Sequence, residues 1–221
     1  MTTSTLPLDF PVPTCRTNQV YVATSDADLA KVRTIWEQVY KEELGWLDEH
    51  NIDPRNDIYH AASVYLLATN ETGEPVGVMR MVIDSECGLP VDNFVDISEL
   101  RKSAQGALVE CARLMVPVKY RDQKFSNYPH GIFAALVKAA LHECLKEKNY
   151  NVLANCFLDT RTTPIKALKQ MGFRDLNIRF RDELNEASDC TVLHLDIKDM
   201  LSIFYGTQSG FGNYIMMRNA G

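Results

Sequence analysis

The sequence has no excess of positive charge and no long apolar run, and each absence excludes a class of protein. Its 221 residues include 23 Lys and Arg against 29 Asp and Glu, for a formal net charge of −6. A general nucleic-acid binder would need more cations to neutralise phosphates. No apolar stretch suits a membrane span or a signal peptide. We therefore expect a cytoplasmic protein with no nucleic-acid partner and no membrane span.

The six cysteines are scattered and follow neither a metal-binding nor a redox pattern. The sequence has no C-x-x-C pair and no clustered histidine, so neither a zinc site nor a redox dithiol is expected. Cys111 and Cys156 lie in apolar runs with no evident histidine partner, which favours buried core residues over nucleophiles. We predict no metal and no permanently bound cofactor.

The apolar content is enough for one sizeable domain. Hydrophobic residues make up 46% of the chain, which can form one core, and we find no repeat of fixed period. The two ends are polar or contain glycine. We expect an N-terminal extension over residues 1–18, a domain over residues 19–205 and a C-terminal tail over residues 206–221.

Helix and strand patterns follow one another without strict alternation. Apolar spacing and turn residues predict strands at Gln19–Thr24, Ala62–Thr69, Val76–Ile83, Ala107–Val116, Val152–Leu158, Leu176–Phe180 and Thr191–Ile197. The same signals predict helices from Ser25 to Gly45, from Pro129 to Leu145, from Thr163-Pro164 to Gly172, and over Lys198–Tyr205. This order predicts a mixed α+β domain around one mostly antiparallel sheet.

Two sets of residues resemble a known superfamily. The segment Thr163–Phe173 is similar to the helix and Gly-Phe that follow the fifth strand of GNAT acyltransferases. The second set resembles the LuxI-type acyl-homoserine-lactone synthases and the FeeM-like long-chain N-acyl amino acid synthases; it comprises Val39-Tyr40, Gly45-Trp46, Asp57 with Tyr59, Val64–Ala68, Gly77–Arg80 and Glu110–Val116. The resemblance covers roughly Leu29–Phe173. It implies a sheet splayed between its fourth and fifth strands, and transfer of an acyl group from a phosphopantetheine thioester to an amine.

Two departures from the LuxI-type pattern bear on the acceptor. Trp36 stands where those families place an arginine, and His60 stands where they place a second aspartate. Both replaced residues belong to the polar network on the acceptor side in the LuxI-type synthases. The departures favour an amino acid, or a lysine- or ornithine-type amine of a peptide, over S-adenosylmethionine.

Glu110 and Arg113 are the candidate catalytic residues. Acyl transfer to an amine needs a base and hydrogen-bond donors for the oxyanion, and Glu110 suits the base, directly or through water. On a regular strand the two side chains would point to opposite faces, so acting together requires a bulge between them. Arg80 and Asp57 are the expected charge partners. The alternative is a buried ion network that only holds the sheet together.

The segment after Val116 suggests which thioester is used. The segment Tyr120–Gly131 lacks the glycine-rich turn that closes around the pyrophosphate of CoA. We therefore favour an acyl carrier protein, whose acidic surface Lys119, Arg121 and Lys124 could meet, over acyl-CoA. Ordinary solvated cations are the alternative. The resemblance also implies that Met115 and Val116 contact the pantetheine arm.

The remaining candidates concern substrate binding. Five residues are expected to bind the substrates: Arg80, Trp46, Asp57, His60 and Asn155. A lone His or Asn, however, often satisfies only local hydrogen bonds. Trp36, Phe94, Phe133, Met115 and Trp46 could line an acyl-chain pocket or form ordinary core. We predict a fatty N-acyltransferase. The alternatives are a lactone synthase using S-adenosylmethionine, an acyl-CoA-dependent acetyltransferase, and a non-catalytic module that binds an acyl carrier.

Overall fold

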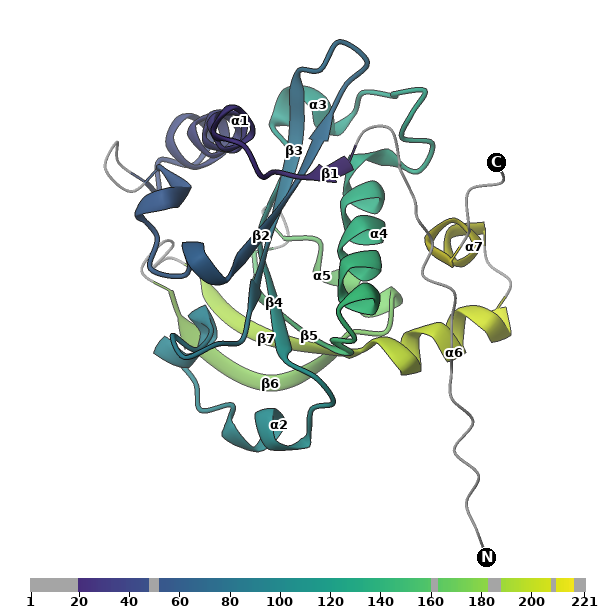
Figure 1. Cartoon of the computed structure of the whole chain (residues 1–221). Coiled ribbons are helices and arrows are strands. Elements are labelled where there is room, and N and C mark those ends of the chain that lie inside the picture. Colours follow the sequence, from purple (N-terminus) through teal and green to yellow (C-terminus); the bar gives the residue numbers. More distant parts are fainter. Residues whose placement is uncertain (1–19, 48–51, 160–162, 183–187, 208–209, 217–221) are drawn as a thin grey trace, which may run out of the picture.

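A seven-stranded sheet forms the centre of the molecule (Figure 1). The computed structural model describes residues 20–47, 52–159, 163–182, 188–207 and 210–216, so the expected extension over residues 1–18 lies outside the described residues. The strands are β1 (Val20–Val22), β2 (Ser63–Thr69), β3 (Pro75–Ile83), β4 (Leu108–Met115), β5 (Asn151–Phe157), β6 (Arg174–Arg181) and β7 (Asp189–Asp196). Their order is β1-β2-β3-β4-β5-β7-β6, and among these described strands only β4 and β5 pair in parallel. The predicted α+β class and mostly antiparallel sheet are confirmed.

Helices flank the sheet, and several of them are short. They are α1 (Asp26–Trp36), which continues as a π-helical segment η1 (Glu37–Glu43), α2 (Ser98–Ser103), α3 (Val118–Arg121), α4 (Gly131–Lys146), α5 (Ile165–Gln170), α6 (Ile197–Thr207) and α7 (Gly210–Met216). The 3-10 turns are η2 (Pro54–Asn56), η3 (His60–Ala62) and η4 (Pro90–Asn93). The sequence did not predict α2, α3 or α7, because helices of one or two turns carry little periodicity.

The helix starts agree with the sequence in part. Ser25 and Asp28 form the expected capping box of α1. Pro164 occupies the N-cap of α5 and not its first helical position, and α4 begins at Gly131, two residues after Pro129. The expected boundaries were wrong by one or two residues at these two helices.

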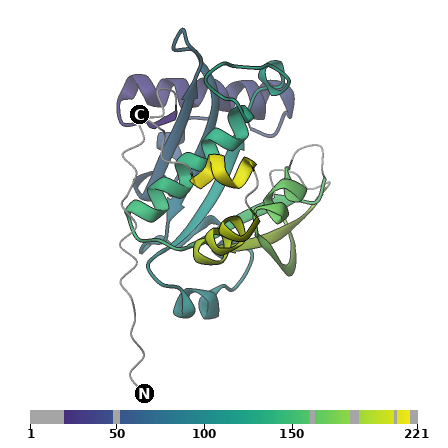
Figure 2. The same cartoon turned by 90° about the vertical axis from the view of Figure 1, so that its right-hand side faces the viewer.

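The two long helices pack on opposite faces of the sheet (Figures 1 and 2). Side chains alternate along a strand, so Leu66 of β2 lies in the core under α4, whereas Leu67 packs with Trp36 of α1. Gly77 of β3 allows α4 to approach closely, since a Cβ there would lie 2.7 Å from the Ile132 side chain and 3.2 Å from the Met115 carbonyl oxygen. The sheet therefore separates two apolar layers.

Strands β4 and β5 diverge after their first three residues. They pair only from Leu108 to Glu110 on β4 and from Asn151 to Leu153 on β5, although both strands continue further. The pairing of β4 with β3 shifts register between Arg80 and Val78, which marks a bulge at Arg113 and Leu114. The predicted splay between the fourth and fifth strands is confirmed.

Candidate functional site

Glu110 is buried at the point where the two strands part. Its side chain is 1% exposed, and Oε2 accepts a hydrogen bond of 2.9 Å from the Val91 N–H of η4. Burial raises the pKa of Glu110 to about 7, although the Val91 N–H and the Arg80 charge act in the opposite direction. This carboxyl can therefore change its protonation state near neutral pH.

Asn155 links Glu110 to β5. Its Nδ2 donates a hydrogen bond of 2.9 Å to Glu110 Oε1, while its Oδ1 is buried with no partner in the described part of the chain. Odd-numbered residues of β5 share one face, so Phe157 lies on the same side and its ring centroid is 4.9 Å from that of Trp46. Asn155 thus contacts the Glu110 carboxyl from the same face of β5 that carries Phe157.

Arg113 takes an unusual backbone conformation at the bulge. Its φ of 49° lies in the left-handed region, which is unfavourable for a residue with a side chain. The guanidinium carbon lies 4.5 Å from the Trp36 ring centroid and 5.3 Å from that of Tyr40. Its Nη2 is 3.5 Å from Asp57 Oδ2. The bulge therefore turns the Arg113 side chain towards α1 and η1.

Asp57 joins the two arginines. Arg80, which is 3% exposed, donates from Nη1 to Asp57 Oδ2 over 2.5 Å. Burial of Asp57 favours its neutral form, but the charge of Arg80 and the Tyr59 N–H outweigh this and lower its pKa below the usual range. Asp57 is consequently an ionised partner shared by Arg80 and Arg113.

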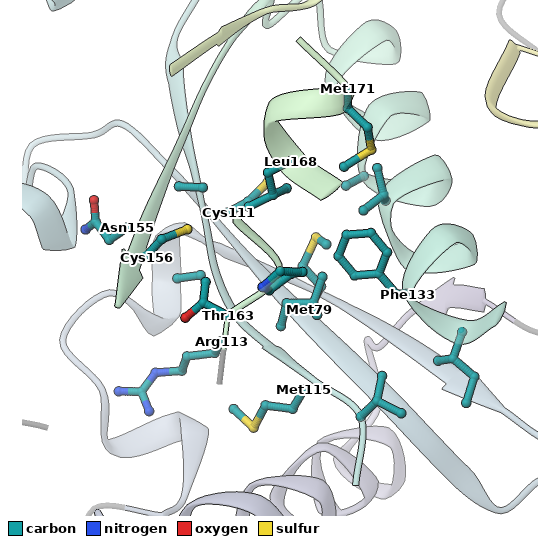
Figure 3. A pocket seen from close by; sticks show the side chains of 18 of the residues that line it. Met79, Cys111, Arg113, Met115, Phe133, Asn155, Cys156, Thr163, Leu168 and Met171 are labelled. Carbon is teal, nitrogen blue, oxygen red and sulfur yellow. The ribbon is translucent and has the colours of Figure 1, made fainter. Parts of the chain in front are cut away.

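A cavity of about 870 Å³ passes through the splay. Its mouth is lined by Arg121, Gln123, His130 and Gly131, next to the start of α4, and its middle by backbone and side chains of β4 and β5. From there it extends into the apolar layer under α4, where it is lined by Phe133, Val137, Ala140, Leu141, Cys144, Val152, Leu168, Met171, Leu195 and Met200 (Figure 3). The volume lies in the upper part of the range for ligand pockets.

The opposite side of the cavity is more polar, and we call it the polar end. It is lined by Tyr40, Trp46, Arg113, Asn155 and Phe157. Figure 3 shows the Arg113 guanidinium and the Asn155 amide on the same side of the cavity, away from Phe133 and Met171. Sequence reasoning did not single out Tyr40 or Phe157 as candidates, because nothing in an apolar or aromatic run identifies which residue faces a cavity.

The other predicted site residues fall in different places. Trp46, Met115 and Val116 line the cavity. His60 lies beside Tyr65, with 3.1 Å between its Nδ1 and the Tyr65 hydroxyl, and is not among the lining residues. Lys119 lies 3.7 Å from Glu74 at the surface. Arg121 donates to Glu43 over 2.7 Å, so both cations have carboxylate partners.

The acyl-chain candidates and the cysteines can also be placed. Phe133 lines the cavity, whereas Trp36 is core beneath Arg113. Phe94 is 38% exposed, stacks on Phe180 and is not among the residues that line the cavity. Burial raises the pKa of both Cys111 and Cys156 to about 12. Their thiols stay protonated at neutral pH, as expected of core cysteines.

The described residues contain neither a candidate metal-binding cluster nor a candidate membrane-spanning helix. Among the described residues, no three His, Cys, Asp or Glu side chains gather in a way that could hold a metal ion. None of the helices in the described ranges combines the length and apolar character needed to cross a membrane.

Comparison with known proteins reveals similarity to acyltransferases. A family model described as an acetyltransferase (GNAT) domain matches residues 35–128. The solved structure of FeeM, an N-acyl amino acid synthase from uncultured soil microbes, superposes with a TM-score of 0.60 at 12% identity, covering 83% of this chain and 92% of that one. A putative N-acetyltransferase from Lactobacillus plantarum gives 0.57 at 13% identity, covering 81% and 97%.

A third solved structure has a similar fold. An aminoglycoside 6'-N-acetyltransferase complexed with coenzyme A gives a TM-score of 0.54 at 10% identity, covering 80% of this chain and 96% of that one. No curated protein sequence matches the chain. At these identities the structural likeness establishes the fold.

Proposed function

We propose that this chain is a GNAT acyltransferase, which its fold and its matched domain support, and that it transfers a fatty acyl group to an amine. The donor is a phosphopantetheine thioester on an acyl carrier protein. The acceptor is an amino acid, or a lysine- or ornithine-type side chain of a peptide. The observation that carries this proposal is the cavity of about 870 Å³, which continues beyond the splay into the apolar layer under α4.

The depth of the cavity favours a long acyl group. Along α4 it is lined from Gly131 to Cys144, a distance of about 20 Å at the helical rise per residue. A thioester carbonyl held at the splay would direct its chain towards Leu141, Cys144 and Leu195. Each methylene buried there contributes about 0.8 kcal/mol, whereas an acetyl group would leave this part of the cavity empty.

The mouth of the cavity suits one phosphate better than a pyrophosphate. Helix α4 starts at Gly131 with no side-chain cap, so its first N–H groups and its dipole are available to an anion. Arg121 lies close by and lines the mouth. The loop from Asp122 to His130 contains no glycine that would let its backbone wrap a second phosphate. A phosphopantetheine arm requires only one.

The chemistry assigned to the site is direct attack of the amine on the thioester. Glu110 is not among the lining residues, so it removes the amine proton through a water molecule beside Asn155. Backbone N–H groups of β4 beyond Glu110, which β5 no longer pairs, stabilise the oxyanion. The C–N bond forms, the C–S bond breaks with its electron pair on sulfur, and the proton taken from the amine passes to the departing thiolate.

Mass spectrometry of a reconstituted reaction tests this proposal. The purified chain is incubated with acetyl, octanoyl and palmitoyl thioesters of an acyl carrier protein and of CoA, together with a panel of amines. We expect amide product with the long-chain carrier thioesters. Equal efficiency with acetyl-CoA would instead indicate an ordinary acetyltransferase.

The other two alternatives give different products in the same reaction. Turnover that requires S-adenosylmethionine would identify a lactone synthase. Binding of the acyl carrier without any turnover would identify a non-catalytic module. Either result would overturn the proposed function.

A further inference from the structure

The connection between β3 and β4 supplies a hydrogen-bond donor to Glu110. Its 3-10 turn η4 places the Val91 N–H 2.9 Å from Glu110 Oε2. Both residues are buried, with exposed fractions of 0% for Val91 and 1% for Glu110. A hydrogen bond donated to a carboxylate favours its ionised form. The position of η4 therefore affects the protonation of Glu110.

Arg101 of α2 joins η4 to the end of β3. Its Nε donates to Asp84 Oδ2 over 2.5 Å, and its Nη2 donates to Asp84 Oδ1 over 3.2 Å. The same Nη2 donates to Asp92 Oδ2, in η4, over 2.7 Å. Because the guanidinium is planar and rigid, these three bonds fix the orientation of η4 relative to β3 as well as its distance.

The two aspartates are in turn held by backbone groups. The Asp84 N–H donates to the Leu108 carbonyl oxygen over 2.9 Å, which ties this aspartate to β4 two residues before Glu110. Asp92 Oδ2 also accepts a hydrogen bond of 2.7 Å from the Leu89 N–H, at the start of η4. A continuous set of hydrogen bonds thus leads from β4 through Arg101 to the turn that contacts Glu110.

Arg101 also neutralises a charge that acts on Glu110. Burial is the main cause of the raised pKa of Glu110; the charges of Asp92 and Asp182 add to it, and the Val91 N–H and the charge of Arg80 on β3 oppose it. Of these charges, Asp92 is the one that pairs with Arg101. Loss of Arg101 would loosen the Val91 N–H and leave Asp92 uncompensated, and both changes disfavour an ionised Glu110.

We propose that Arg101 is a positioning residue, which holds η4 against the end of β3 so that the Val91 N–H stays on the Glu110 carboxyl. Arg101 is not among the residues that line the cavity, so it acts through Glu110 and not on a substrate. This inference rests on the proposed function, in which Glu110 is the base. A second bond, from Asn93 Nδ2 to the Tyr59 hydroxyl over 2.9 Å, keeps η4 attached when Arg101 is replaced.

Arg101→Gln tests the assignment through the pH dependence of kcat/KM for acyl transfer. The midpoint of the rise in activity, expected near pH 7 in the wild type, should move up by about one pH unit, as for one weakened hydrogen bond to a charged group. Below this midpoint kcat/KM should fall about tenfold. At high pH it should stay close to the wild-type value, whereas a merely structural loss would lower activity equally at every pH.

Arg179→Gln is the matched control. The Arg179 side chain is 42% exposed and pairs with Asp175 at 14%, much as Arg101 at 36% pairs with Asp84 at 13%, but it lies on the edge strand β6. Its midpoint should equal that of the wild type. If Arg101→Gln fails to fold, Arg101→Lys keeps the charge without the planar fork and should give a smaller upward shift. An unmoved midpoint in a folded Arg101 variant, or an equal shift in Arg179→Gln, would overturn the assignment.

A measurement without substrate separates this inference from the proposed function. In protein labelled with ¹³C-glutamate, the carboxyl signal missing from Glu110→Gln is that of Glu110, and its titration midpoint should rise by the same amount in Arg101→Gln. A rise without any turnover supports the positioning role and contradicts the proposed function. An unchanged titration in an enzyme that does transfer acyl groups overturns the positioning role alone.

Discussion

Asn155 donates a hydrogen bond of 2.9 Å to Glu110 and so joins β5 to β4 where their backbone pairing ends. An amide nitrogen can only donate, so this bond keeps one carboxyl oxygen fixed as an acceptor in both protonation states. With a pKa of about 7, Glu110 changes its charge near neutral pH. The first two predictions follow from this pair.

Glu110→Gln should lower kcat/KM by about 10²- to 10⁴-fold, the usual contribution of a general base. In the wild type, activity should rise with pH through about 7, as Glu110 ionises. This rise of activity with pH should be absent in Glu110→Gln. Glu99→Gln, at a side chain that is 86% exposed, is the control, and an unaltered pH profile in Glu110→Gln would exclude the assigned base.

The same group should make stability depend on pH. Its folded pKa of about 7 exceeds the unfolded value of 4.5, so the fold favours the protonated form. The stabilisation is complete below pH 4.5 and is lost as pH rises through 7, by about 3 kcal/mol for this shift. The free energy of unfolding is measured with urea below pH 4.5 and above pH 7. It should fall by this amount between the two conditions in the wild type and not in Glu110→Gln.

The backbone at Arg113 should be strained. Because its φ is 49°, Arg113→Gly should be more stable than Arg113→Ala by about 1 kcal/mol. Both variants lose the guanidinium and should lose activity together. Lys148, at φ 59° near the end of α4, offers the comparison outside the site: Lys148→Gly should raise stability and leave turnover intact. Chemical denaturation measures all three.

Filling the deep part of the cavity should shorten the acyl groups it accepts. Ala140 lines the cavity and neighbouring Ala139 does not. In Ala140→Phe, the ratio of palmitoyl to acetyl transfer should fall by about tenfold or more, since a few methylenes lose their burial. Ala139→Phe should keep the ratio of the wild type, and an equal ratio in both variants would place the chain elsewhere.

Charge at the cavity mouth should govern the use of a carrier protein. Arg121→Glu reverses a cation that now pairs with Glu43, and it should raise KM for an acyl carrier protein thioester about tenfold, more than it alters kcat. The effect should shrink as ionic strength rises. Lys146→Glu, at the other end of α4 and paired with Glu143, is the matched control. Equal effects of the two reversals would argue against docking at this mouth.

Much of the sheet was predictable because its signals are local. The apolar and β-branched runs of β2 and β3 and the Ser25 capping box can be read within a few neighbouring residues. The splay and the bulge were expected from the resemblance and from the odd spacing of Glu110 and Arg113. The short helices α2, α3 and α7 carried no comparable signal.

The site itself was predictable only in part, because its contacts span long stretches of chain. Glu110 meets Val91 across 19 positions and Asn155 across 45, and no spacing rule connects such pairs. The lone His60 gave no indication that it would lie beside Tyr65. Which apolar residues of α4 line a cavity, and which merely fill the core, depends on where β5 diverges.

The divergence of β4 from β5 leaves backbone groups of both strands unpaired with each other. Beyond Glu110 and Leu153, within the described residues, these strands present edges to each other that they do not pair, and a donor whose amides bonded there would act as an additional strand. Binding of the donor would then stabilise the folded chain, by about 2.7 kcal/mol when the donor is present at a hundred times its dissociation constant. The unfolding temperature of this protein would therefore rise with the concentration of the acyl donor.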